Sequence, residues 1–133
     1  MKPLNAIDVQ TTEPQVLEVS RKLALAIGES APFRKYEETT ENLRADKEAQ
    51  RLLSEFQKAQ QNLQMMQSWG GATDKDFEQF EKLQTQLFAN PILKEYFKAQ
   101  EDLVTKLKEL NVFISEKLGF DFANLTKPAG GCC

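Results

Sequence analysis

One stretch of the sequence decides the fold, and it runs from Asp46 to Trp69: DKEAQRLLSEFQKAQQNLQMMQSW. Apolar or small side chains recur in it at alternating intervals of three and four residues, which is the heptad pattern of a packed helix. These positions are Ala49, Leu52, Phe56, Ala59, Leu63 and Met66. A helix over the stretch would be about 36 Å long. Asp46 suits its N-cap, and Gly70-Gly71 is expected to end it.

Two more helices are predicted downstream. Thr73 is expected to cap the first of them, whose apolar side chains are Phe77, Phe80, Leu83, Leu87 and Phe88. Asn90-Pro91 is a strong signal for the start of another helix, because asparagine suits the N-cap and proline suits the first helical position. The last helix then continues to Gly119 with one apolar face, at a spacing typical of a nearly straight helix. This face comprises Ile92, Tyr96, Ala99, Leu103, Leu107, Leu110, Ile114 and Leu118.

Two helices are also predicted upstream. Thr12 and Gln15 form a capping-box pattern at the start of the first, and Gly28 is expected to end it. Ser30 can cap the second. No glycine or proline separates the second helix from the third, so the two could also be one helix with a kink near Ala45-Asp46.

The sequence therefore predicts an all-α fold of about five helices, with a long antiparallel helical hairpin formed by the third and fourth. Alternation with period two is absent, so no strands are expected. Residues 1–11 are assigned to an N-terminal tail, 12–119 to the helical domain and 120–133 to a C-terminal tail. Helices this long are expected to protrude and to self-associate along their apolar faces. The alternative is one compact bundle in which every apolar helix face is buried within the same chain.

Composition excludes several classes of function. The chain has 133 residues, a net charge of −3 and no histidine. Without histidine, Ser-His-Asp catalysis and a histidine zinc site are impossible. The acidic balance argues against a protein that binds nucleic acid through its phosphates. No segment resembles a signal peptide or a membrane span of roughly 20 apolar residues, so a cytoplasmic protein without membrane contact is expected.

Two features of the predicted hairpin could serve a binding function. Trp69, the lone tryptophan, lies at the hairpin tip and is expected to pack over Phe77, with a role as an exposed binding anchor as the alternative. Glutamine-rich faces of the third and fourth helices fit either a protein interface or a solvated surface. The acidic side chains have the spacing of a helix surface and are not expected to catalyse.

Cys132 and Cys133 are the candidate metal ligands. Two adjacent thiols cannot complete a zinc or iron-sulfur site, so any metal would be shared between chains. The alternative, favoured by the residues alone, is an unstructured tail that is prone to oxidation.

Two segments carry a resemblance to a known family. Asp46–Leu53, followed by Phe56, and Asn90–Tyr96, followed by Ala99, resemble the YlbF/YmcA family, and the likeness covers roughly residues 12 to 118. The resemblance implies a small, all-helical, self-associating bacterial cytoplasmic protein that acts as a regulatory adaptor. Such proteins assemble with relatives and a third protein, and promote competence, sporulation and biofilm formation by controlling an endoribonuclease that matures messenger RNA.

The resemblance implies no catalytic residues. It does imply an iron-sulfur cluster in some complexes, which here could involve only Cys132 and Cys133. The resulting hypothesis is a non-enzymatic adaptor that forms a homo-oligomer and binds regulatory proteins. The alternative is a metal- or redox-responsive module that shares an iron-sulfur cluster through these cysteines. A third hypothesis, an RNA-binding protein, has less support because the chain is acidic.

Overall fold

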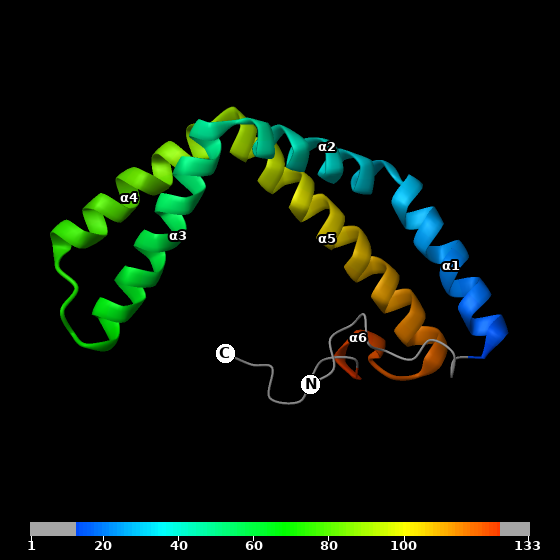
Figure 1. Ribbon diagram of the computed structural model, residues 1–133. Helices are drawn as coiled ribbons and strands as arrows, with labels where there is room; N and C mark the ends of the chain where they lie inside the picture. Colours follow the sequence, from blue (N-terminus) through cyan, green and yellow to red (C-terminus); the bar gives the residue numbers. More distant parts are fainter. Residues whose placement is uncertain (1–12, 126–133) are drawn as a thin grey trace. The chain divides into compact units, whose positions relative to one another are not determined.

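The computed structural model describes residues 13–125, and these residues form six α-helices without a strand (Figure 1). The helices are α1 (Pro14–Glu29), α2 (Ala31–Ala45), α3 (Lys47–Ser68), α4 (Asp74–Ala89), α5 (Pro91–Leu118) and α6 (Phe122–Leu125). The predicted all-α fold is confirmed. The four-residue α6 was not predicted, and it lies in the segment that the sequence pattern assigned to a C-terminal tail.

Side-chain caps divide the chain where the sequence predicted. The Asp46 Oδ1 accepts a hydrogen bond from the Ala49 amide at 2.8 Å, and Asp46 itself has an extended backbone. Thr73 and Asp76 form a reciprocal capping box at the start of α4. Since Asp46 caps a new helix, α2 and α3 are separate helices and not one kinked helix.

The ends of α1 differ from the prediction. Gly28 does not end the helix, which continues to Glu29. Ser30 ends it instead, because its amide and its hydroxyl both donate to the Ile27 carbonyl, at 3.0 and 2.5 Å. Glu13 is the N-cap and makes no side-chain cap hydrogen bond. Thr12, the predicted cap, lies outside the described residues.

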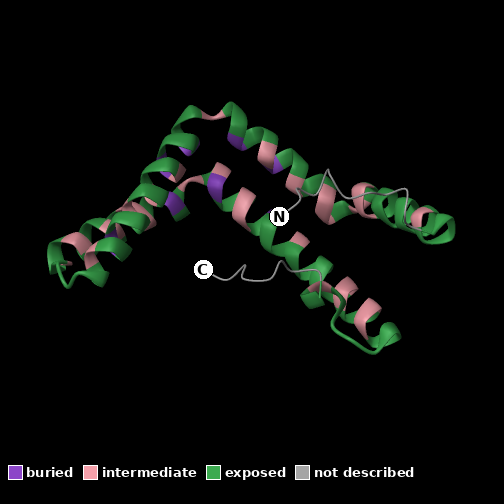
Figure 2. Ribbon diagram, turned by 60° about the horizontal axis from the view of Figure 1, so that its bottom comes forward, coloured by how far each residue is buried: buried purple, intermediate pink, exposed green. Residues whose placement is uncertain are grey.

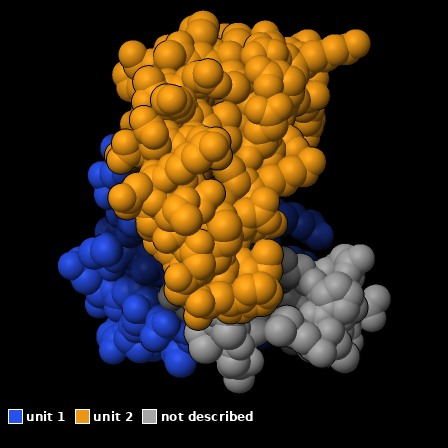
Figure 3. All heavy atoms as spheres, turned by 90° about the vertical axis from the view of Figure 1, so that its left-hand side faces the viewer, with its two compact units in different colours: residues 1–34, 103–133 blue, residues 35–102 orange. Residues whose placement is uncertain are grey.

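The chain divides into two compact units (Figure 3). Unit 1 comprises residues 1–34 and 103–133, and unit 2 comprises residues 35–102. Unit 1 thus contains α1, the C-terminal half of α5 and α6, whereas unit 2 contains α3, α4, most of α2 and the first turns of α5. The boundary was not visible in the sequence, because the apolar face of α5 crosses it without interruption.

Unit 2 holds the hydrophobic core (Figure 2). Its centre is a cluster of buried side chains to which α2, α3, α4 and α5 all contribute: Leu43, Ala49, Leu52, Leu87 and Leu93. Thr39 is buried as well, and its hydroxyl donates within α2, so no polar atom is stranded there. The caps of α3 and α5 lie beside this cluster, because Asp46 and Asn90 accept hydrogen bonds from the amides of Ala49 and Leu93, two of its members.

The predicted hairpin is present within unit 2, where α3 and α4 pack against each other and run in opposite directions (Figure 1). Gly70 makes the turn at the end of α3 with φ +72°, a left-handed conformation that favours glycine. Along the hairpin, the heptad seam of α3 faces α4: Leu63 is buried, and Phe56 and Met66 are half-buried.

Candidate functional site

The first candidate site is an apolar surface on unit 1. Among residues 13–34 and 103–125, the part of unit 1 that the structure describes, none is buried. On α1, Val16 and Val19 are 52% and 65% exposed, and Leu23 is also exposed. This helix therefore has the apolar stripe of a packed helix, but Val16, Val19 and Leu23 of that stripe stay exposed in the described structure.

The C-terminal half of α5 contributes the other side of this surface. Its stripe continues through Leu103, Leu107 and Leu110, which are half-buried or exposed. A groove of about 320 Å³ lies between α1 and α5, and its lining includes Leu23, Ile27, Leu103, Leu107 and Leu110. We call the apolar surface formed by six of these side chains the unit 1 face: Val16, Val19, Leu23, Leu103, Leu107 and Leu110.

More apolar side chains of unit 1 are exposed away from the predicted stripes. Asn111 and Ser115 hold the start of α6, because the Asn111 Oδ1 accepts from the Ala123 amide and the Ser115 Oγ accepts from the Phe122 amide, both at 3.0 Å. Helical periodicity did not reveal the exposed side chains around this anchor; only their size and polarity could have marked them. They are Val112, Phe113, Phe120, Phe122 and Leu125, and Leu25 on α1 is exposed as well.

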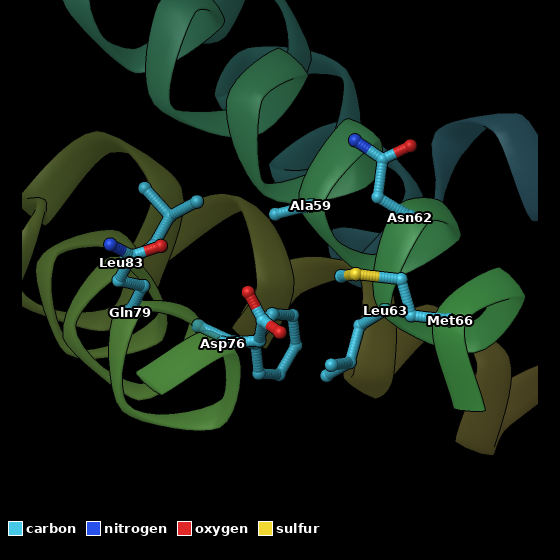
Figure 4. Close-up of a pocket in the computed structure, with 8 residues that line it drawn as sticks. Ala59, Asn62, Leu63, Met66, Asp76, Gln79 and Leu83 are labelled. Carbon is cyan, nitrogen blue, oxygen red and sulfur yellow. The ribbon is translucent and has the colours of Figure 1, made fainter. Parts of the chain in front are cut away.

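The second candidate site is the tip of the α3–α4 hairpin in unit 2. A pocket of about 280 Å³ opens between the two helices there (Figure 4). Its apolar lining includes Leu63, Met66 and Phe80, and Asn62 and Gln79 add two amide groups. This is called the tip pocket below.

Trp69 lies at this tip and is 80% exposed. The prediction that it packs over Phe77 was therefore wrong, and Phe77 is itself 39% exposed. The physical reason is local: α3 ends at Ser68 and Trp69 is its C-cap, so the indole lies beyond the turns that pack on α4. The alternative, an exposed aromatic side chain available for binding, fits the structure.

The charged side chains occupy helix surfaces, as their spacing predicted. Arg51 pairs with Glu48 and with Glu55, the latter at 2.7 Å, and its hydrogen bond to Glu48 lowers the pKa of that carboxyl. At the start of α4, the amide and hydroxyl of Thr73 lower the pKa of Asp76. These shifts come from exposed surface pairs and from helix capping.

The predicted metal ligands Cys132 and Cys133 lie outside the described residues, so their role stays a prediction. Within residues 13–125, no group of three or more histidine, cysteine, aspartate or glutamate side chains could hold a metal ion. In the same range, every helix is too short or too polar to cross a membrane.

Comparison with solved structures identifies a similar fold. A chain of the X-ray crystal structure of Bacillus subtilis RicA in complex with RicF matches this chain with a TM-score of 0.70. The two chains are 20% identical, and the match covers 81% of this chain and 96% of the other. This likeness shows the fold.

Sequence comparison gives the family. A UPF0342 protein of Desulfitobacterium hafniense is 27% identical over 120 residues, 90% of this chain and 87% of the relative. A UPF0342 protein of Streptococcus equi subsp. zooepidemicus is 30% identical over 96 residues, 71% of this chain and 85% of the relative. Residues 16–119 match the family model described as control of competence regulator ComK, YlbF/YmcA. The resemblance noted at Asp46–Leu53 and Asn90–Tyr96 is thus confirmed, and the chain belongs to the YlbF/YmcA family.

Proposed function

We propose that this protein is a non-enzymatic regulatory adaptor, which uses the unit 1 face to assemble with copies of itself or with relatives, and which binds regulatory proteins. In the cell, such assemblies would modulate RNA processing and, through it, developmental programmes such as competence, sporulation and biofilm formation. The protein would act by bringing other proteins together.

One observation carries this proposal: unit 1 has apolar stripes on two helices and no buried residue in its described part. Burial of apolar surface is worth about 25 cal/mol per Å², or about 1.5 to 3 kcal/mol for a whole valine or leucine side chain. A stripe left in water forgoes that stabilisation. Contiguous apolar patches on a soluble protein usually mark contact sites for other proteins.

The comparisons support the regulatory part. The family description concerns control of a competence regulator, and the similar fold comes from a complex of two proteins, RicA and RicF. The groove between α1 and α5 could accept side chains of a partner helix, since helices bind in such grooves through apolar residues spaced three and four apart.

Sedimentation equilibrium tests the assembly. The wild-type protein is expected to have a mass well above the 15.2 kDa of one chain, and Val19→Glu is expected to shift it toward the monomer because the new carboxylate would be buried in the interface. Arg21→Gln is the matched control: it changes the net charge by the same amount on the face of α1 opposite the apolar stripe, and it should leave the mass unchanged. A monomeric wild-type protein at working concentration would defeat the proposal.

A further inference from the structure

We propose that a hollow between α5 and α6 in unit 1 is a docking site for an arginine side chain of a regulatory protein. We call it the α5–α6 pocket. Its volume is about 500 Å³, and it is lined by Val112, Ser115 and Glu116 of α5 and by Phe120 and Asp121 of the turn before α6. The proposal rests on the adaptor function and deepens it by giving the chemistry of one contact with a partner.

The turn that forms one wall of the α5–α6 pocket is fixed by local contacts. Asn111 and Ser115 accept hydrogen bonds from the first two amides of α6, both at 3.0 Å. Gly119 reverses the chain with φ +79°, a left-handed conformation that favours glycine. Phe120 and Asp121 are therefore held beside α5 before a partner arrives, and binding does not have to order them.

The apolar part of the lining suits the stem of a long side chain. Val112 and Phe120 are 54% and 45% exposed. The aliphatic stem of arginine packs on apolar surface while its charged head stays near water. Its planar guanidinium also stacks on aromatic rings, which an ammonium group does less well. Phe120 is the aromatic ring of this pocket.

The charges that line the pocket select a cation. Glu116 and Asp121 both line it, and neither forms an ion pair with another described residue. Lys117 follows Glu116 in the sequence, but its ammonium nitrogen lies over the ring of Phe113, 5.6 Å from the centre. Lys108 precedes Val112 by one turn and is not part of the lining. A guanidinium can donate to both carboxylates at once, because it carries five N–H groups.

An arginine carried by a protein fits this pocket better than a free cation or a nucleic acid. The carboxylates would repel phosphates and the anionic surface of a membrane. Small-molecule ligands usually have about 70 to 90% of their surface buried, and a pocket with such exposed walls offers less. A protein would gain further contacts from Phe122 and Leu125 of α6, which are 41% and 71% exposed.

The α5–α6 pocket is separate from the surface assigned to assembly. By helical periodicity, Val112 and Glu116 lie on the side of α5 opposite Leu107 and Leu110 of the unit 1 face. A partner in the pocket would therefore leave the unit 1 face free. One chain can then assemble with other copies and bind a regulatory protein at the same time.

Fluorescence anisotropy of a labelled peptide tests the proposal on the full wild-type chain. The peptide carries one arginine between leucines, and its control carries citrulline, which has the same shape without the charge. The arginine peptide is expected to bind in a saturable way, and the citrulline peptide about tenfold more weakly, because two exposed ion pairs are lost. Free spermidine at the same concentration as the peptide is expected not to displace it.

Matched variants locate the binding. Phe120→Ala is expected to weaken the affinity for the arginine peptide about fivefold, since the guanidinium loses its ring. Phe113→Ala, which removes an exposed phenylalanine of α5 outside the lining, should not weaken it. Glu116→Gln should weaken it up to about fivefold, the limit for one exposed ion pair. Glu18→Gln removes the same charge from α1 and should have no effect.

The outcomes separate this proposal from the adaptor assembly. Val19→Glu should still bind the peptide, and Phe120→Ala should still have the sedimentation mass of the wild type. The docking proposal is overturned if the arginine peptide does not bind, if the citrulline peptide binds equally well, or if Phe113→Ala weakens binding as much as Phe120→Ala. Displacement by spermidine would overturn it in favour of a small cation. Circular dichroism of each variant checks that the helices are intact.

Discussion

The Phe56 and Phe80 rings stack between α3 and α4, with their centroids 5.2 Å apart and their planes at 28°. Phe56 also packs against the core cluster of unit 2, and Phe80 lines the tip pocket. The pair therefore connects the core to the tip pocket of the hairpin. Aromatic pairs in this arrangement contribute about 0.5 to 1.5 kcal/mol beyond the area that they bury.

Phe56→Ala should lower the free energy of unfolding by about 2 to 4 kcal/mol. Fully buried phenylalanines cost about 3 to 5 kcal/mol when truncated, and Phe56 is only half-buried. Urea denaturation followed by circular dichroism measures the change. Phe88→Ala serves as the control, since Phe88 is 53% exposed and should cost less. An unchanged midpoint for Phe56→Ala would contradict the packing of the hairpin.

The capping box at α4 predicts a dependence on pH. The pKa of Asp76 lies below its ordinary value of 3.8 because the amide and hydroxyl of Thr73 donate to the ionised carboxylate. A lowered folded-state pKa means that the stabilisation is complete above pH about 4 and is lost as the pH falls through the folded-state value. Asp76→Asn should be less stable than the wild type at neutral pH, and the difference in melting temperature should shrink below pH about 4. A constant difference would show that the charge does not matter.

Tyr36 and Tyr96 predict a second titration. Their rings lie 5.8 Å apart within unit 2, and a hydrogen bond to Tyr36 raises the pKa of Tyr96 above 10.0, with burial adding to the shift. The chain contains two tyrosines, so Tyr36→Phe leaves Tyr96 as the single phenol. The absorbance titration of Tyr96 should then move to lower pH than in the wild-type protein. An unmoved step would show that Tyr36 is not the cause.

Local chemistry was predictable from the sequence, whereas burial was not. The caps Asp46, Thr73 and Asn90 were found because each needs only its own side chain and the next three residues. The prediction that Gly28 ends the first helix was wrong because the Ser30 hydroxyl donates a hydrogen bond to the Ile27 carbonyl and ends the helix there. The prediction that Trp69 packs over Phe77 was wrong because the exposure of Trp69 depends on where α3 ends relative to α4.

The apolar face of α5 illustrates the same limit. Its spacing is regular from Ile92 to Leu118, yet Ala99 is the last buried residue on the described part of the helix. Periodicity shows which side of a helix is apolar, but it cannot show whether the same chain covers that side. The unit 1 face could therefore be predicted as a stripe, and only the structure revealed it as a surface without a cover.

The cysteines separate the adaptor hypothesis from its alternative. We expect Cys132→Ser with Cys133→Ser to leave the sedimentation mass unchanged, because the unit 1 face drives assembly. Wild-type protein purified without oxygen from cells that contain its partners should also be colourless and free of iron. A visible absorption band with bound iron, lost in the double variant, would instead support a shared iron-sulfur cluster.

The contrast between the two units predicts their protection from hydrogen exchange. In the monomeric Val19→Glu variant, the amides of α1 should exchange quickly, because few buried contacts oppose the local opening of a helix that has no buried residue. The amides of α3 around Leu52 should stay protected, since opening them exposes the core of unit 2. In the wild-type assembly, α1 should gain protection as the protein concentration rises, because association and helix stability are then linked. Mass spectrometry of exchanged peptides measures both regions in one sample, and equal protection of α1 at all concentrations would show that the unit 1 face has no partner in the assembly.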